Sequence, residues 1–168
     1  SHMGRPIPFG SVSNLVAAWQ KSDAIPRAQA RPGMVFHGGI HRNADPYYRI
    51  PQKRIVKNLV TDQKIRTSST RSLGAFGNVF AIESFMNELA YASEQDAVQF
   101  RLDHLPDNRS KLVLATAAEC LDGYLVAKID GWQYGRGIAF ARYKNSKCYA
   151  AVSIVLAVNQ ETFDISLQ

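Results

Sequence analysis

The loop from Thr67 to Gly77 is the stretch whose residue types and spacing best suit chemistry. It is built of small, hydroxyl-bearing and glycine residues, and it runs directly into an amphipathic helical pattern. A loop of this kind before a helix N-terminus turns backbone N–H groups outward, where the helix dipole favours negative charge. Arg71 adds a cation to the same loop. The pattern indicates either an anion site or a tight corner before the helix, and the corner is the more common use of such a motif.

Other catalytic sets are not evident. Outside the first three residues the histidines are His37, His41 and His104, and no Ser/His/Asp or Cys/His set can be assembled from them. His37 and His41 flank two glycines, which favours polar loop residues over metal ligands. Glu83 and Glu88 are candidates for paired acids, but the favoured interpretation is that they are helix-surface or capping carboxylates that satisfy nearby backbone groups and arginines. We therefore predict neither a catalytic residue nor a metal site.

The composition is that of a globular domain large enough to have its own core: 168 residues, 46% hydrophobic and 20% charged. Cys120 and Cys148 are expected to be buried free thiols. No apolar run reaches the length of a membrane span, and no signal peptide is visible.

The net charge of +6 is concentrated in one part of the chain, residues 42–71, which we call the basic strip. Its cations are Arg42, Arg49, Lys53, Arg54, Lys57, Lys64, Arg66 and Arg71. Such a strip is a solvated face, a nucleic-acid footprint or a seat for a phosphate-bearing cofactor. Nucleic acid is disfavoured because exposed aromatics do not regularly interleave the cations and no nucleic-acid-binding motif occurs.

The elements that would position these residues predict an α+β fold. It has a mixed or antiparallel sheet with a C-terminal three-stranded meander packed against about three helices. Short strands are expected at 34–40 and 54–60, and the meander strands at 137–143, 148–158 and 163–167. The first helix should bury a face made by Ile82, Phe85, Met86 and Leu89. A second helix is expected from a Ser93 cap to Pro106, and a third from an Asp107 or Asn108 cap through Leu121.

Three blocks in the chain carry a family resemblance. They are residues 46–51 (PYYRIP), 66–75 (RTSSTRSLGA) and 83–90 (ESFMNELA), continued by 99–102 (QFRL) and 135–139 (GRGIA). In this order they resemble the molybdopterin-binding large subunit of the xanthine dehydrogenase/aldehyde oxidase family. The nearest type is the bacterial isoquinoline 1-oxidoreductase or aldehyde dehydrogenase, and the resemblance covers residues 33–168.

That family hydroxylates aldehydes or N-heterocycles at a molybdenum centre, with water as the oxygen source. The resemblance implies that Arg71, Ser72, Leu73, Gly74 and Ala75 line the cofactor. Ser72 stands where the family often has glycine, and Leu73 where xanthine oxidases have a substrate-stacking phenylalanine, so a xanthine-type substrate is not expected. The implied partners are the remaining lobes of the large subunit and an iron–sulfur electron-transfer subunit.

The resemblance also implies what this chain lacks. The family's catalytic glutamate lies in a Gly-x-Gly-Glu-like motif, and nothing here matches it. We therefore expect a fragment that is inactive and without cofactor on its own: residues 1–3 a tag remnant, 4–32 an N-terminal arm and 33–168 a partial molybdopterin-binding domain. The compartment, bacterial cytoplasm or periplasm, stays open. Two alternatives remain: a non-catalytic module that uses the basic strip to bind nucleic acid or another polyanion, and a structural fragment of the same family without a cofactor role.

Overall fold

The computed structural model describes residues 39–58, 71–124 and 128–167. The described residues fall into two compact units: residues 39–45, 54–58 and 71–78 belong to the first, and residues 46–53, 79–124 and 128–167 to the second. Helix α2, Ala75–Ala92, contributes its first turn to the first unit and the rest of its length to the second.

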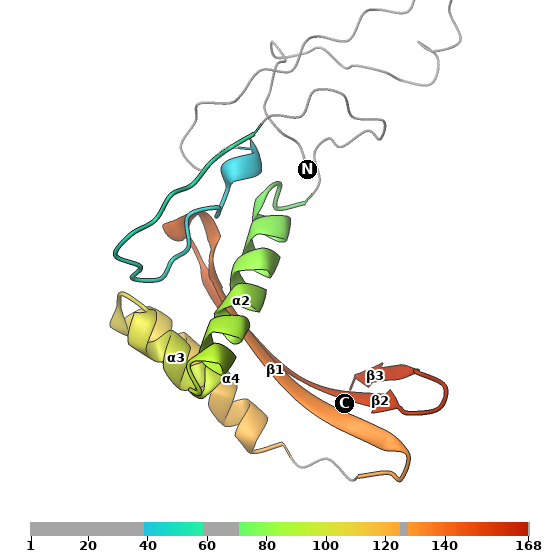
Figure 1. The fold of residues 1–168 in the computed structure, drawn as a ribbon. Helices are drawn as coiled ribbons and strands as arrows, with labels where there is room; N and C mark the ends of the chain where they lie inside the picture. Colours follow the sequence, from blue (N-terminus) through green and yellow to red (C-terminus); the bar gives the residue numbers. More distant parts are fainter. Residues whose placement is uncertain (1–38, 59–70, 125–127, 168) are drawn as a thin grey trace, which may run out of the picture. The chain divides into compact units, whose positions relative to one another are not determined.

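The second unit contains an antiparallel meander with the strand order β1-β2-β3 (Figure 1). The strands are β1 at Trp132–Arg142, β2 at Tyr149–Asn159 and β3 at Ile165–Leu167. The predicted α+β class and C-terminal meander are thus confirmed. The first strand starts five residues earlier than the predicted 137, because the backbone before that position, Gly135 included, is extended and paired with β2.

The two turns of the meander are formed by residues in the left-handed conformation and by side-chain hydrogen bonds to the backbone. Lys144 and Asn145 have φ values of 55° and 53°, which reverses the chain between β1 and β2. After β2, the Asn159 side-chain oxygen accepts hydrogen bonds from the backbone N–H groups of Glu161 and Thr162. Both turns fall between the predicted strands, at residues 144–147 and 159–162.

Helices α3, Ala97–His104, and α4, Asn108–Asp122, follow α2. The predicted cap of α4 is confirmed: the Asp107 carboxylate accepts from the Ser110 N–H at 2.9 Å. The predicted Ser93 cap is wrong. Asp96 caps α3 and accepts from the N–H groups of Val98 and Gln99, while Ser93 Oγ donates back to carbonyls at the end of α2. Glu94, with φ 54°, turns the chain between the two helices.

The core of the second unit lies where α2, α3 and α4 meet the sheet (Figure 1). Its buried members are Tyr48, Met86, Ala90, Phe100, Leu105, Leu114, Ile138 and Phe140. The predicted face of α2 is partly wrong: Met86 is buried, but Phe85 is 56% exposed. The stripe that faces the core is centred on Glu83, Met86 and Ala90, whereas the sequence pattern places Glu83 outside it.

Two further expectations are wrong among the described residues. Arg54–Asn58 is not a strand, and Gly39–His41 is a 3-10 helix, η1. Residues 34–38 and 59–60 of the two predicted strands lie outside the described residues. Cys120 and Cys148 are free as predicted, but both are exposed rather than buried. In the described parts of the chain, no helix is long and apolar enough to cross a membrane.

Candidate functional site

The turn that precedes α2 contains the residues singled out by the sequence. Arg71, Ser72, Leu73 and Gly74 form the turn, and Ala75 is the first residue of the helix. Ser72 and Leu73 are both left-handed, with φ values of 64° and 52°. The left-handed conformation costs an L-residue about 1–2 kcal/mol, so two such residues in succession make a strained turn.

Contacts with η1 fix this turn in place. The Gly74 N–H donates to the Gly39 carbonyl at 3.1 Å, and a Cβ at Gly74 would lie only 2.3 Å from the Ile40 carbonyl oxygen. Glycine at position 74 therefore serves a close approach of two backbones. Asn78, one turn into α2, donates from Nδ2 to the carbonyls of Ile40 and Arg42 at 2.7 and 3.0 Å.

Beside these contacts lies a hollow of about 270 Å³. His41 and Lys57 both line it, with Nδ1 and Nζ 3.3 Å apart. No carboxylate is among its lining residues, which are Ile40, His41, Ala44, Ile55, Val56, Lys57, Asn58, Gly74, Gly77 and Asn78. The electrostatics of this hollow thus suit an anion or a neutral polar group rather than a cation.

The five predicted residues differ in exposure. Arg71 and Ser72 are exposed, Leu73 is half-buried, and Gly74 and Ala75 are buried. Only the first two have side chains open to a ligand. The sequence reasoning did not connect His41 and Lys57 with this turn, and it did not single out Asn78, because no local pattern connects residues 40–57 with the start of α2.

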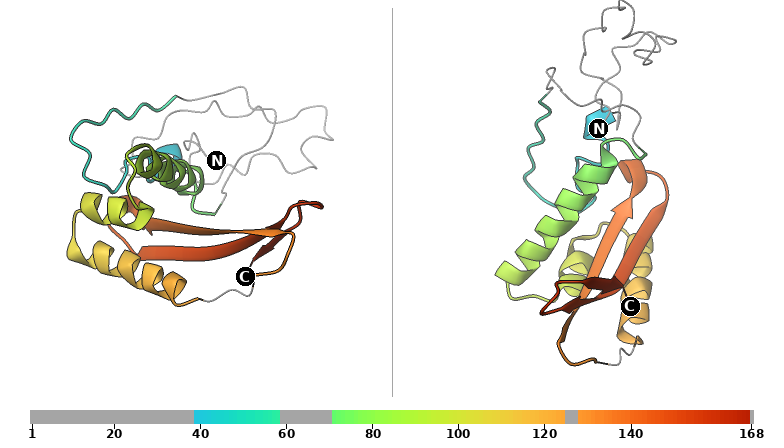
Figure 2. Two further views of the ribbon diagram at one scale, coloured as in Figure 1. Left: turned by 60° about the horizontal axis from the view of Figure 1, so that its bottom comes forward. Right: turned by 90° about the vertical axis from the view of Figure 1, so that its right-hand side faces the viewer.

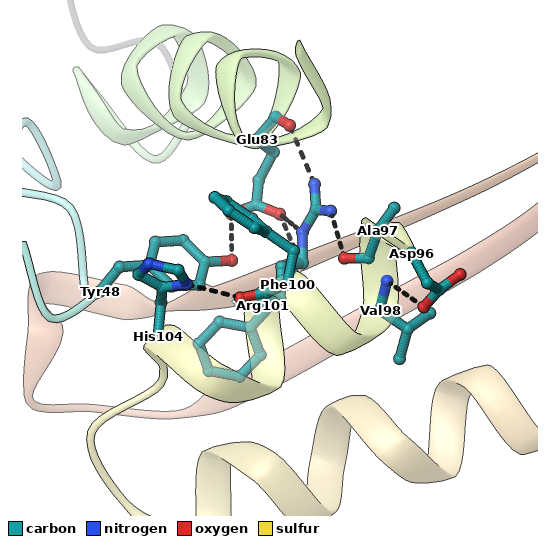
Figure 3. A network of polar contacts seen from close by, with 9 residues as sticks. Tyr48, Glu83, Asp96, Ala97, Val98, Phe100, Arg101 and His104 are labelled. Atoms are coloured by element: carbon teal, nitrogen blue, oxygen red, sulfur yellow. Dashed lines mark hydrogen bonds and ion pairs between the residues drawn. The ribbon is translucent and has the colours of Figure 1, made fainter. Parts of the chain in front are cut away.

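Glu83, one of the two candidate acids, lies at the centre of a buried hydrogen-bond network (Figure 3). Its Oε2 accepts from Arg101 Nε at 2.9 Å and from the Phe140 N–H at 3.0 Å, and its Oε1 accepts from the Tyr48 hydroxyl at 2.7 Å. Arg101, fully buried, also donates to the carbonyls of Ala97 and Glu83. The expected partners of Glu83, a backbone group and an arginine, are confirmed, but its expected place on the helix surface is wrong, because the carboxylate is buried.

Glu88 does not join Glu83. It is exposed, and five residues along a helix place two side chains about 140° apart around the axis. Burial, together with the adjacent Glu83 carboxylate, raises the pKa of Tyr48 far above its usual value, so its hydroxyl stays a donor. The network joins α2, α3, β1 and the Tyr48 segment without a group positioned for acid–base chemistry.

A second polar cluster lies at the start of α4. Tyr47 donates to Asp107 Oδ2 at 2.6 Å and accepts a short hydrogen bond from Arg142. The Arg142 guanidinium lies 5.0 Å from the centre of the Tyr47 ring and 4.5 Å from that of Tyr149. Burial and the hydrogen bond to Asp107 raise the pKa of Tyr47 to about 12. This cluster attaches the segment around Tyr47 to both the sheet and α4.

The basic strip is divided between the two units. Arg49 donates to the Pro106 carbonyl at 2.6 Å in the second unit, while Arg54, Lys57 and Arg71 belong to the first. Lys64 and Arg66 lie outside the described residues. None of the described contacts favours the strip as a nucleic-acid surface.

Of the other predicted groups, His104 is part-buried with Nδ1 2.7 Å from the Phe100 carbonyl, and His37 lies outside the described residues. Within ranges 39–58, 71–124 and 128–167, no group of three or more His, Cys, Asp or Glu side chains is placed to hold a metal ion.

The candidate site is thus a strained turn with a basic residue, Arg71, at the N-terminus of a helix in an α+β domain. No family model matches the chain. The chain is similar to one of the subunits of nicotinate dehydrogenase from Pseudomonas putida, with 34% identity over an aligned 138 residues. The alignment takes in 75% of this chain and 12% of the relative, so the chain spans about an eighth of that subunit's length. This distant, partial homologue supports the family resemblance carried by the sequence blocks, without selecting the isoquinoline 1-oxidoreductase type.

Proposed function

We propose that the chain is part of the large subunit of a molybdenum hydroxylase and that its turn at 71–75 lines the cofactor in the parent enzyme. The observation that carries the proposal is the similarity to a dehydrogenase subunit across three quarters of the chain. The order of the sequence blocks around residues 46–51, 66–75 and 83–90 supports the same family.

The residues of the turn fit a cofactor with phosphate and oxo oxygens. The Arg71 guanidinium is exposed and offers charge-assisted hydrogen bonds, and the exposed Ser72 hydroxyl is a second donor. The first amides of α2 add the positive end of the helix dipole. Gly74 and Ala75, which are buried, contribute the backbone of the turn rather than side chains. When bound, the molybdenum group supplies hydroxylation with oxygen taken from water; this chain's residues bind and orient it.

We propose an N-heterocycle as the substrate of the parent enzyme, in preference to an aldehyde. The relative is named for nicotinate, which is an N-heterocycle. Because that relative is named as one subunit, the parent enzyme would also include a partner for electron transfer, which we infer to be an iron–sulfur subunit. The chain alone would be inactive, since the Gly-x-Gly-Glu-like motif does not occur in it.

The test is the molybdenum content of the full reading frame, expressed in cells that make the cofactor and measured by elemental analysis. Arg71→Ala should lower the molybdenum content about tenfold, the effect expected from losing a charge-assisted hydrogen bond. The matched control is Arg136→Ala, which removes a half-exposed arginine from a loose ion pair with Asp122 at 3.6 Å. A parent protein that purifies without molybdenum would refute the family function. Equal loading of both variants would leave the family intact and assign the turn a structural role.

A further inference from the structure

The face of the sheet turned away from α4 is apolar. Directly paired residues of antiparallel strands share a face, and Ile138, Phe140, Val155 and Ala157 belong to the face that the helices cover. The opposite face is made by Gln133, Gly135, Gly137, Ala139, Ala141, Ala150, Val152, Ile154, Leu156, Val158, Ile165 and Leu167. No charged residue is among them, and Gln133 alone is polar. We call this surface the open face.

The large side chains of the open face are accessible to solvent. Val152 is 60% exposed, Ile165 71% and Leu167 73%. In the right-hand view of Figure 2 the strands lie in front of α3 and α4, with this side of the sheet toward the viewer. An antiparallel sheet with one face in water normally alternates apolar and polar residues, and a continuous apolar patch of this kind marks an interface.

The glycines of β1 also indicate that the open face is an interface. A Cβ at Gly135 would have no described atom within 4 Å, and one at Gly137 would make only ordinary contact with Ile154. Neither glycine has a positive φ. The described fold therefore needs glycine at neither position, although glycine weakens a strand. Glycine inside a strand often marks a place where another backbone approaches closely.

We propose that the open face is buried in the parent subunit by an apolar layer from the remainder of the same polypeptide. This inference rests on the proposed function, because the relative is about eight times the length of the matched part and so has ample further chain to supply that layer. The large side chains of β2 and β3 on the open face would pack into this layer. The glycines and alanines of β1 on the same face would let the backbone of the layer come close to the sheet.

The experiment compares thiol accessibility in this chain and in the full reading frame, starting from a Cys120→Ser, Cys148→Ser background. A thiol is introduced on the open face by Val152→Cys, and a control thiol on the polar side of α2 by Glu88→Cys. Both thiols should react with a maleimide at similar rates in this chain alone, because both positions are exposed. In the full reading frame, the thiol at position 152 should react at least about tenfold more slowly than the control.

Equal reaction rates at the two positions in the full reading frame, or a reading frame with no further chain, would overturn the inference. Protection at position 152 in this chain alone, increasing with concentration, would also overturn it and identify a second copy as the occupant. The readout is independent of molybdenum. If the open face were protected in a subunit that contains no molybdenum, the cofactor proposal would be refuted and the proposed burial of the open face would be supported.

Discussion

Glu83 on α2 and Arg101 on α3 form a buried ion pair, with 2.9 Å between Oε2 and Nε, and the same carboxylate also accepts from the Phe140 N–H of β1. A single side chain thereby connects two helices and a strand that are far apart in sequence. Each buried partner is satisfied, so the network orients these elements as well as stabilising them.

Removing one partner of this pair should strongly destabilise the chain. We expect Arg101→Met to lower the free energy of unfolding by about 3–5 kcal/mol, because it leaves the Glu83 carboxylate buried without its countercharge. Urea unfolding followed by circular dichroism measures the change. Adding Glu83→Gln should restore part of the loss. Arg136→Ala, which breaks a surface ion pair, should stay within about 1 kcal/mol of the parent. If Arg101→Met lowered the free energy of unfolding by no more than Arg136→Ala does, the buried ion pair would be contradicted.

The two glycines at the start of α2 should respond oppositely to alanine. Gly74→Ala places a Cβ against the Ile40 carbonyl and should cost about 1–3 kcal/mol, as overpacking does. Gly77→Ala meets no described atom within 4 Å and should be neutral or stabilise the helix by up to about 1 kcal/mol. Hydrogen exchange at the amides of residues 74–78 gives the local readout. Faster exchange in both variants, or in neither, would show that η1 does not hold the turn.

Acid should weaken the contribution of Asp107. Burial raises the pKa of this carboxyl, but hydrogen bonds from Tyr47 and Ser110 outweigh it and leave the pKa below its ordinary 3.8. A lowered folded-state pKa gives stability that is present above the ordinary value and lost as the pH falls through the lowered one. Asp107→Asn should therefore be less stable than the parent at about pH 6, and the difference in stability should shrink as the pH falls below the ordinary value of 3.8. A difference in the free energy of unfolding that did not change with pH would mean that ionisation of Asp107 does not contribute to stability.

The stabilising contribution of Tyr47 should be lost in alkali rather than in acid. Its pKa is raised to about 12 by burial and by the hydrogen bond to Asp107, so its contribution is complete below the ordinary value of 10 and disappears as the pH rises through about 12. The phenolate absorbance of the native chain should include a late-titrating group that Tyr47→Phe removes. If that variant instead removed a group titrating near 10, the contact with Asp107 would be absent in solution.

Local signals predicted much of the second unit. Asp107 as a cap and Gly123 past the end of α4 fix that helix within a few residues, and turn-forming residues separate the strands. Periodicity failed at Glu83 because it assigns every charge to the solvent side, whereas the partner that permits burial, Arg101, lies on another helix.

The candidate site was predictable in one part only. The turn residues 71–75 were singled out by a loop pattern and by a family resemblance, but the chain that packs against them, Gly39–Arg42, was not. A backbone approach such as that of Gly74 to Ile40 depends on two segments more than thirty positions apart, and no period or propensity reports it. Residues 54–58 alternate like a strand, yet they form no strand among the described residues, because alternation alone does not supply a pairing partner.

The hydrogen bond from Phe140 to Glu83 has a consequence for aggregation. In the order β1-β2-β3, β1 is an edge strand, and unpaired amides on such an edge invite pairing with another chain. Because a side chain from α2 already accepts from the Phe140 N–H, a foreign strand that paired with β1 at this position would have to break the buried network first. The carboxylate that organises the core therefore also protects this part of the β1 edge against strand addition.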